Sequence, residues 1–260
     1  MGLSGSLRAL VLLSLLAVGC RSAKPDPGKV DIDALADIIK FFDDNYKKLE
    51  KKEVVRQYAV AINVAEKQCK ENFAPDDRNF LTNESLTHDQ IKSKIYDENV
   101  ALYEGQELIA AGTLKKRKYN RHSESILMNP TDCSESSPMT KLLNKTKDGC
   151  VVFYTYNSPC AQTCTNTSSP YNILGALEEW RKRGGLKAFV FQKIWKYDEN
   201  KAYLEEVFKA ITQYVPLYRC LPSKGCYECV QKGNINQNGV QSGNINQDCV
   251  QSGNINHVST

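Results

Sequence analysis

Apolar residues recur along the chain with two kinds of spacing. An apolar residue at every third or fourth position predicts amphipathic helices, and such segments span 30–52, 171–183 and 201–214. Continuous or alternating apolar runs predict strands, and they span 56–64, 100–114 with a break at Glu104-Gly105, 149–156 and 186–194. Because strands alternate with helices, we expect an α/β fold with parallel strand pairs.

Polar stretches separate these segments. Residues 66–97 are polar and irregular, which predicts an insertion or a long loop, and residues 129–149 read as a loop over at least part of their length. Residues 121–128 can open a helix. Pro159 suits the first turn of another helix, because its fixed φ and missing N–H are tolerated there.

The end of the chain has a different pattern. Val230, Val240 and Val250 each begin a unit of the form V-Q-x-G-N-I-N. Such polar repeats cannot build a globular core. We therefore expect a domain over 24–221 and a cysteine-containing low-complexity tail over 222–260. A disordered tail is the simpler expectation, and self-association through stacked repeats is the alternative.

Composition narrows the function classes only slightly. The 260 residues are 41% hydrophobic and 25% charged, so the chain can bury a core and is neither disordered throughout nor collagen-like. A net charge of +4 neither requires nor excludes nucleic acid. Five basic side chains lie close together and could attract phosphates, or form a solvated loop: Lys115, Lys116, Arg117, Lys118 and Arg121.

Several features predict a secreted glycoprotein. Residues 1–23 resemble a signal peptide, with Arg8 before an apolar run over 9–18 that is too short to span a bilayer. A membrane anchor is the alternative, and we expect no span in the mature chain. Glycosylation sequons begin at Asn83, Asn144 and Asn166. Ten cysteines are also many for a cytosolic protein.

Four residues have the chemistry of a catalytic zinc site. His122 and Glu124 stand at a predicted helix start, and Cys160 and Cys164 follow a predicted strand. One imidazole and two thiolates fill three zinc positions and leave one open, as catalytic sites require. On a helix, Cys160 and Cys164 would share one face. Glu124 could then move protons without binding the metal.

This arrangement resembles the H-x-E and P-C-x-x-C signature of zinc-dependent nucleoside and nucleic-acid deaminases. Here three residues, rather than two, separate the cysteines. The stretch Thr155 to Cys160 (T-Y-N-S-P-C) is similar to the S/T-W-S-P-C segment of the AID/APOBEC-like branch, with Tyr for Trp and one extra residue. Trp195 to Asp198 stands where that branch has a loop contacting the base next to the target. The resemblance covers about 57–214.

The resemblance implies a cytidine deaminase-like three-layer α/β/α sandwich with a mixed five-stranded sheet. It implies zinc-dependent conversion of cytosine to uracil, in single-stranded DNA or RNA, by an exported enzyme with a possible immune defence role. Trp195 and Tyr197 could stack on a base, or pack structurally, and Asp198 could bind a base edge. Lys115, Lys116 and Arg117 are the candidate phosphate contacts.

Two other functions remain open from the sequence. A deaminase of free cytidine would not need the basic cluster. A non-catalytic secreted protein could bind or assemble through its repeats, with Cys160 and Cys164 in structural roles.

Discounting Cys20 and the two candidate ligands leaves 10 − 3 = 7 cysteines, an odd number. For the C-x-x-C pair Cys226 and Cys229, disulfides to Cys220 or Cys249 are the plainest expectation, and the connectivity stays undetermined.

Overall fold

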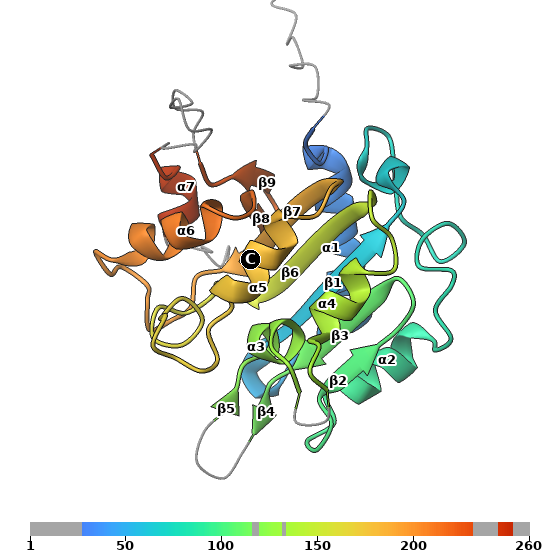
Figure 1. Ribbon diagram of the computed structural model, residues 1–260, viewed down its shortest axis with the longest axis horizontal. Helices are drawn as coiled ribbons and strands as arrows, with labels where there is room; N and C mark the ends of the chain where they lie inside the picture. The colour runs from blue at the N-terminus through green and yellow to red at the C-terminus, as the bar shows by residue number, and fades with distance from the viewer. Residues whose placement is uncertain (1–27, 116–119, 132–133, 231–243, 252–260) are drawn as a thin grey trace, which may run out of the picture.

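The computed structural model describes residues 28–115, 120–131, 134–230 and 244–251. The predicted signal peptide, Lys116, Arg117, Cys133 and most of the repeats lie outside these ranges. Two layers of helices enclose a central sheet, as the family resemblance implied (Figure 1). Among the described residues, no helix is both long enough and apolar enough to cross a bilayer.

The sheet contains seven strands, in the order β2-β3-β1-β6-β7-β8-β9. They span Leu102–Glu104 (β2), Leu108–Gly112 (β3), Tyr58–Val64 (β1), Cys150–Asn157 (β6), Leu186–Lys193 (β7), Leu217–Leu221 (β8) and Gly225–Glu228 (β9). The pairs β6–β7 and β7–β8 are parallel, as predicted, and the others are antiparallel. Two short strands, Leu114–Lys115 (β4) and Asn120–Arg121 (β5), pair outside this sheet.

The helices span Ile32–Tyr46 (α1), His88–Ile95 (α2), Ser123–Met128 (α3), Pro138–Leu143 (α4), Leu174–Arg181 (α5), Leu204–Thr212 (α6) and Gln247–Val250 (α7). Short 3-10 helices span Lys51–Glu53 (η1) and Glu66–Cys69 (η2). The predicted loops at 66–97 and 129–149 thus contain α2 and α4. Both helices begin at side-chain N-caps, Thr87 and Ser137, which stabilise a short helix by satisfying its first backbone N–H groups.

The five-stranded sheet was an incorrect expectation, because β8 and β9 extend it to seven strands. β9 has no strong apolar pattern, and β8 is short, with its buried apolar residues Leu217 and Tyr218 followed by a charged one. Arg219 interrupts β8, and the Cys220–Cys226 disulfide joins directly opposed residues of β8 and β9. Covalent and backbone pairing therefore hold this edge of the sheet together, where a hydrophobicity pattern gives little signal.

Alternating side chains of the strands fill two separate cores. On β1, Ala59 and Ala61 face the layer that contains α3, α4, α5 and α6, whereas Val60 and Ile62 face α1 and α2. This two-sided burial explains the nearly continuous apolar runs of β1, β6 and β7. Figure 1 shows α1 on the far side of the sheet from α3 and α5.

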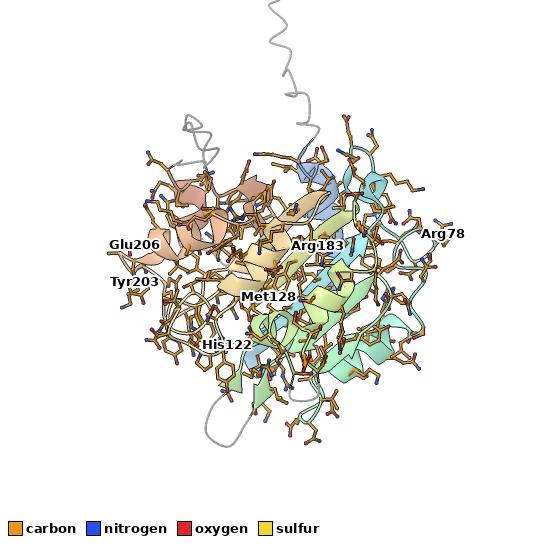
Figure 2. The ribbon with its side chains drawn as sticks, viewed as in Figure 1. Arg78, His122, Met128, Arg183, Tyr203 and Glu206 are labelled. Atoms are coloured by element: carbon orange, nitrogen blue, oxygen red, sulfur yellow. A yellow bond between two sulfur atoms is a disulfide. The ribbon has the colours of Figure 1, made fainter. Side chains whose placement is uncertain are left out.

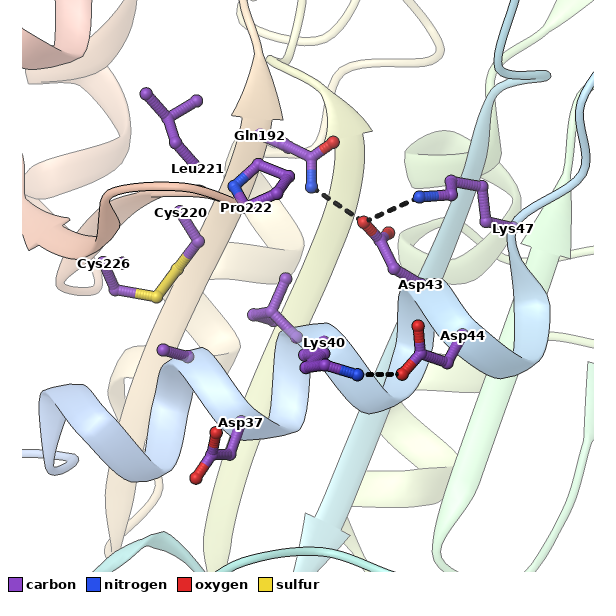
Figure 3. A pocket seen from close by; sticks show the side chains of 13 residues that line it. Asp37, Lys40, Asp43, Asp44, Lys47, Gln192, Cys220, Leu221, Pro222 and Cys226 are labelled. Atoms are coloured by element: carbon purple, nitrogen blue, oxygen red, sulfur yellow. Dashed lines mark hydrogen bonds and ion pairs between the residues drawn. A yellow bond between two sulfur atoms is a disulfide. The ribbon is translucent and has the colours of Figure 1, made fainter. Parts of the chain in front are cut away.

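The carboxylate of Asp43 fixes α1 to the sheet. It accepts hydrogen bonds from Tyr58 (2.6 Å), Tyr154 (2.9 Å) and Gln192 (2.9 Å), and it pairs with Lys47 at 3.4 Å. Figure 3 shows Gln192 and Lys47 beside a cavity of about 300 Å³ between α1 and the Cys220–Cys226 edge. Most of the charged side chains that line this cavity pair with one another, so they help to hold the fold together and do not by themselves indicate a ligand site.

Part of the tail belongs to the folded structure. The sheet continues across the boundary predicted after Leu221, since β9 pairs with β8. Cys229 is disulfide-bonded to Cys249, and Ile245 is 3% exposed in the core beside α6. Arg219 Nη1 donates to backbone carbonyls around the end of α7, including Gln251 O at 2.6 Å. The second repeat unit is therefore anchored to the domain over 244–251.

Three disulfides join described cysteines: Cys69–Cys150, Cys220–Cys226 and Cys229–Cys249. The expectation that Cys220 and Cys249 pair with the C-x-x-C cysteines is thus confirmed. Within the described residues, Cys160 and Cys164 are the free cysteines. Neither candidate ligand is therefore part of a disulfide, so both sulfur atoms are available to bind a metal.

Removing the Cys69–Cys150 disulfide is expected to destabilise the protein most. The bond closes a sequence separation of 81 residues, whereas Cys220–Cys226 closes 6. Loop-closure entropy then gives losses of about 4 and about 2 kcal/mol in the free energy of unfolding. Denaturant unfolding of the two double-alanine variants measures both losses. Equal losses would show that chain entropy does not govern these bonds.

Candidate active site

A histidine and two cysteines meet at one end of the sheet. His122 Nδ1 lies 3.6 Å from Cys160 Sγ and 3.6 Å from Cys164 Sγ, and the two sulfur atoms are 3.5 Å apart. His122 is the N-cap residue of α3. Figure 2 shows it at the start of that helix, beside the β4–β5 hairpin.

The cysteines come from a turn, so the helix predicted from Pro159 is an error. The backbone N–H of Cys164 donates to Cys160 O at 3.0 Å, which makes one helical turn that does not continue. Asp198 supports this turn by accepting from Ala161 N at 3.0 Å. The single turn still places both sulfur atoms beside the imidazole, as the i, i+4 spacing predicted.

These separations fit a zinc ion. Tetrahedral zinc with Zn–S of about 2.3 Å and Zn–N of about 2.0 Å places sulfur about 3.5 Å from nitrogen and about 3.8 Å from sulfur. The observed separations are 3.6 and 3.5 Å. Both cysteines are buried, at 5% and 0% exposure. His122, Cys160 and Cys164 form a group that could hold a metal ion.

The three groups share protons when no metal is bound. Hydrogen bonds from Cys164 and His122 lower the pKa of the Cys160 thiol, while donation to Cys160 and burial raise the pKa of Cys164. The hydrogen bond to Cys160 raises the pKa of His122. These shifts favour a thiolate at Cys160, a thiol at Cys164 and a protonated imidazole at His122. Binding a metal through all three must displace protons.

Glu124 is a buried carboxylate next to this cluster. Its side chain is 2% exposed, and burial raises its pKa. Ser123 Oγ donates to Glu124 Oε2 at 3.0 Å, and Gln57 Nε2 lies 3.4 Å from Glu124 Oε1. A carboxyl group with a raised pKa is suited to both accepting and releasing a proton near neutral pH.

Gln57 is a site residue that the sequence analysis did not identify. It stands immediately before β1, and its Nε2 donates to Ser123 Oγ (3.1 Å) and Thr155 Oγ1 (2.8 Å). Its Oε1 accepts from Asn157 N (3.0 Å) and Asn157 Nδ2 (2.6 Å). One side chain thus connects α3 with the end of β6.

A cavity of about 320 Å³ opens at these groups. It lies where β6 and β7 end, as expected for ligand sites in sheets with parallel strands. Glu124, His122 and Cys160 line one part of it. The other lining residues are Gln57, Thr113, Asn120, Asn157, Ser158, Trp195, Lys196 and Tyr197.

Comparison with protein-family models agrees with this geometry. The model described as Secreted Novel AID/APOBEC-like Deaminase 1 matches residues 32–242, most of the chain. The chain belongs to this family. Comparisons with curated proteins and with solved structures find no match. The resemblance stated from the short zinc motif is therefore confirmed over a much longer stretch.

Membership in this deaminase family and the disulfides agree on the compartment. The family is described as secreted, and the disulfides described above form in oxidising compartments. The predicted extracellular location is thus confirmed. The leader sequence itself lies outside the described residues.

Two of the predicted base-contacting residues line the cavity, and the third does not. Trp195 lines it, with its ring centroid 6.1 Å from that of His122, and Tyr197 is 63% exposed at the rim. Asp198 is 2% exposed and does not line the cavity. It accepts from Ala161 N and from Tyr203 OH at 3.0 Å each. Asp198 therefore supports the cysteine turn.

The predicted basic cluster is divided in the structure. Lys115 is exposed and lines a second cavity beside the first. Arg121 instead donates to Ser125 O (3.2 Å) and Pro130 O (3.1 Å), which fixes it to the backbone around α3.

All three predicted glycosylation residues lie on the surface. Asn83, Asn144 and Asn166 are each exposed. Asn166 Oδ1 accepts from Ser168 N at 2.9 Å, and Asn144 Oδ1 accepts from Arg183 at 2.6 Å. Their exposure is compatible with glycosylation, which stays a prediction.

Proposed function

We propose that this chain is a zinc-dependent hydrolase that converts cytosine to uracil in single-stranded nucleic acid. The observation that carries the proposal is the buried carboxylate of Glu124 in one cavity with the His122, Cys160 and Cys164 cluster. Family membership supports deamination, and the cluster supports the metal.

His122, Cys160 and Cys164 would hold the zinc ion, which when bound supplies the acidity that makes water nucleophilic at neutral pH. In the proposed reaction, water adds at C4 of cytosine and ammonia leaves. Glu124 takes one proton of the water at a carboxylate oxygen and delivers it to ring nitrogen N3, and it then takes the second proton of that oxygen and delivers it to the amine, which leaves as ammonia while C4 keeps the oxygen. Ser123 donates a hydrogen bond to that carboxylate, and Trp195 forms part of the cavity wall.

A second cavity supports a polymer as the substrate. It measures about 460 Å³ and shares Gln57, Thr113, Asn157, Trp195 and Lys196 with the first. A free nucleoside would occupy the first cavity only, whereas a strand could continue along the second. Cationic side chains outnumber the carboxylates of Glu50 and Glu53 in the lining of this extension, with Arg56 paired to Glu50 at 3.8 Å; the cationic ones are Arg56, Lys115, Lys193 and Lys196.

The testing experiment measures zinc content and uracil formation on secreted, glycosylated wild-type protein. The substrates are single-stranded DNA, single-stranded RNA and cytidine. Uracil formed from an oligonucleotide much faster than from cytidine supports the proposal. Faster turnover of cytidine would show that the substrate is a free nucleoside. Zinc binding without turnover of any substrate would contradict the proposed reaction.

Substituting Lys115 and Lys193 together with alanine is expected to weaken oligonucleotide binding and leave cytidine turnover unchanged, because both line the second cavity only. Each lost phosphate contact should reduce the salt slope of log K by about 0.7 for a single strand. Titration at several salt concentrations measures the slope. Lys40→Ala with Lys209→Ala is the matched control on other surfaces, and an equal loss there would indicate only a general charge effect.

Export suggests action on foreign nucleic acid, and we propose an immune defence role on that basis alone.

Self-association through the tail is a separate proposal. Light scattering of the full chain and of a chain ending after Gln251 tests it, because the anchored unit is retained in both. Identical oligomeric states would exclude assembly through the last repeat.

A further inference from the structure

The hydrogen bonds around Gln57 determine which way its amide points. Thr155 Oγ1 donates to Asn157 O at 3.1 Å, which uses its hydroxyl hydrogen. That hydroxyl must therefore accept from Gln57, so Nε2 of Gln57 faces Thr155 at 2.8 Å. The backbone N–H of Asn157, 3.0 Å away, independently requires Gln57 Oε1 on the other side.

The orientation of Gln57 fixes that of Asn157 in turn. Gln57 Oε1 can only accept, so Asn157 presents Nδ2 to it at 2.6 Å. This leaves Asn157 Oδ1, which accepts no hydrogen bond from any residue that the structure describes. Asn157 lines both the metal cavity and the second cavity. A free carbonyl oxygen with a fixed orientation therefore belongs to the wall of the site.

We propose that Asn157 Oδ1 accepts a hydrogen bond from a donor group of the bound nucleotide, and that Gln57 is the positioning residue that fixes the orientation of the Asn157 amide. The inference rests on the proposed function. The donor is an N–H of the exocyclic amine or an O–H of the sugar. A site built to accept such a bond discriminates against a ligand that lacks the donor, because the oxygen then loses its partner.

Binding can be measured without turnover, because the chain has two tryptophans and one of them lines the cavity. Trp195 is at the site, whereas Trp180 is fully buried. Quenching of Trp195 fluorescence in a stopped-flow instrument reports occupancy of zinc-loaded protein before the product accumulates. The probes are short single strands with one target cytosine, as DNA and as RNA, and the same strands with uracil at that position.

Asn157→Ala is expected to weaken binding of the preferred strand about fivefold to tenfold, in line with one lost hydrogen bond. It should also remove the preference of the wild type for that strand over the one lacking the donor. If the variant no longer discriminates between cytosine and uracil, the donor is the exocyclic amine. If it no longer discriminates between RNA and DNA, the donor is the sugar hydroxyl. Unchanged affinity and unchanged discrimination would overturn the inference.

Gln57→Ala tests the positioning role. If Gln57 acts through Asn157, the single Gln57→Ala variant reproduces most of the lost discrimination, and adding Asn157→Ala changes little further. Additive effects would overturn this role. Gln192→Ala is the control, because Gln192 also donates to a carboxylate, that of Asp43, but in the other core. A merely structural role would lower zinc content or Tm and weaken all four strands equally.

The two hypotheses fail in different ways. Wild-type protein that binds the strands with discrimination but forms no uracil overturns the proposed reaction and leaves the role of Asn157 standing. Wild-type protein that forms uracil, with no change of affinity in Asn157→Ala, overturns the role of Asn157 alone. Wild-type protein that binds none of the strands overturns both.

Discussion

Glu124→Gln is expected to lower uracil formation by more than about 1,000-fold while the zinc content stays that of the wild type. General acid–base catalysis contributes about 100- to 10,000-fold, and an amide cannot shuttle the proton. The new side chain fits the existing hydrogen bonds, since its oxygen can accept from Gln57 and its nitrogen can donate to Ser123. Uracil assays and metal analysis on one preparation measure both quantities.

The same variant should also unfold at a higher temperature than the wild type in the metal-free state. Burial raises the pKa of Glu124, so its charged form is disfavoured in the folded protein. That penalty grows as pH rises from the ordinary pKa of a glutamate to the raised one and is constant above it, and the amide removes it. A variant with wild-type turnover would contradict the role of Glu124, and a variant without zinc would leave loss of the metal as the explanation.

Cys164→Ala is expected to abolish zinc retention and activity together. Cys164 is fully buried and contributes one of the two sulfur atoms of the cluster. Losing an outer partner of a ligand costs about 10- to 100-fold in metal affinity, and losing the ligand itself costs more. Dialysis against a chelator of known affinity measures the change. Cys220→Ala with Cys226→Ala is the control, because it removes two cysteines and should retain the metal.

Zinc loading of the wild type should release about two protons at pH 7. His122 has a raised pKa and so carries a proton that binding displaces, and Cys164 is a thiol for the same reason. Affinity therefore falls as pH falls. Calorimetry in buffers of different ionisation enthalpy counts the protons. Uptake of zinc with no proton release would show that the metal does not bind through these groups.

The sequence predicted the ligand set because these residues form short motifs, H-x-E and P-C-x-x-x-C, next to predicted helices and strands. His122 is the N-cap residue of α3, Glu124 lies in the first turn of that helix, and Cys160 follows β6, so the neighbouring sequence indicated the place of each residue. The sequence also predicted the layered α/β fold and its parallel strands. The prediction of a helix after Pro159 was wrong, because the polar residues that follow Cys164 allow only one turn.

Gln57 and Asn157 were missed for a physical reason. Their hydrogen bonds join residues 66 to 100 positions apart, and no local pattern reports such contacts. One signal was present, since Asn157 is the extra residue in the T-Y-N-S-P-C stretch. Similarly, the polar composition of the repeats concealed the anchored unit at 244–251, which depends on a disulfide and on Arg219.

The strand order dictates when this protein can fold during its synthesis. β1 pairs with β3 early in the chain, but its other edge stays open until β6 is made from residue 150 onward. The Cys69–Cys150 bond cannot form before then either. An open strand edge is prone to incorrect pairing. The nascent chain therefore has its most vulnerable interval between residues 112 and 150, and chaperone dependence during export should be greatest there.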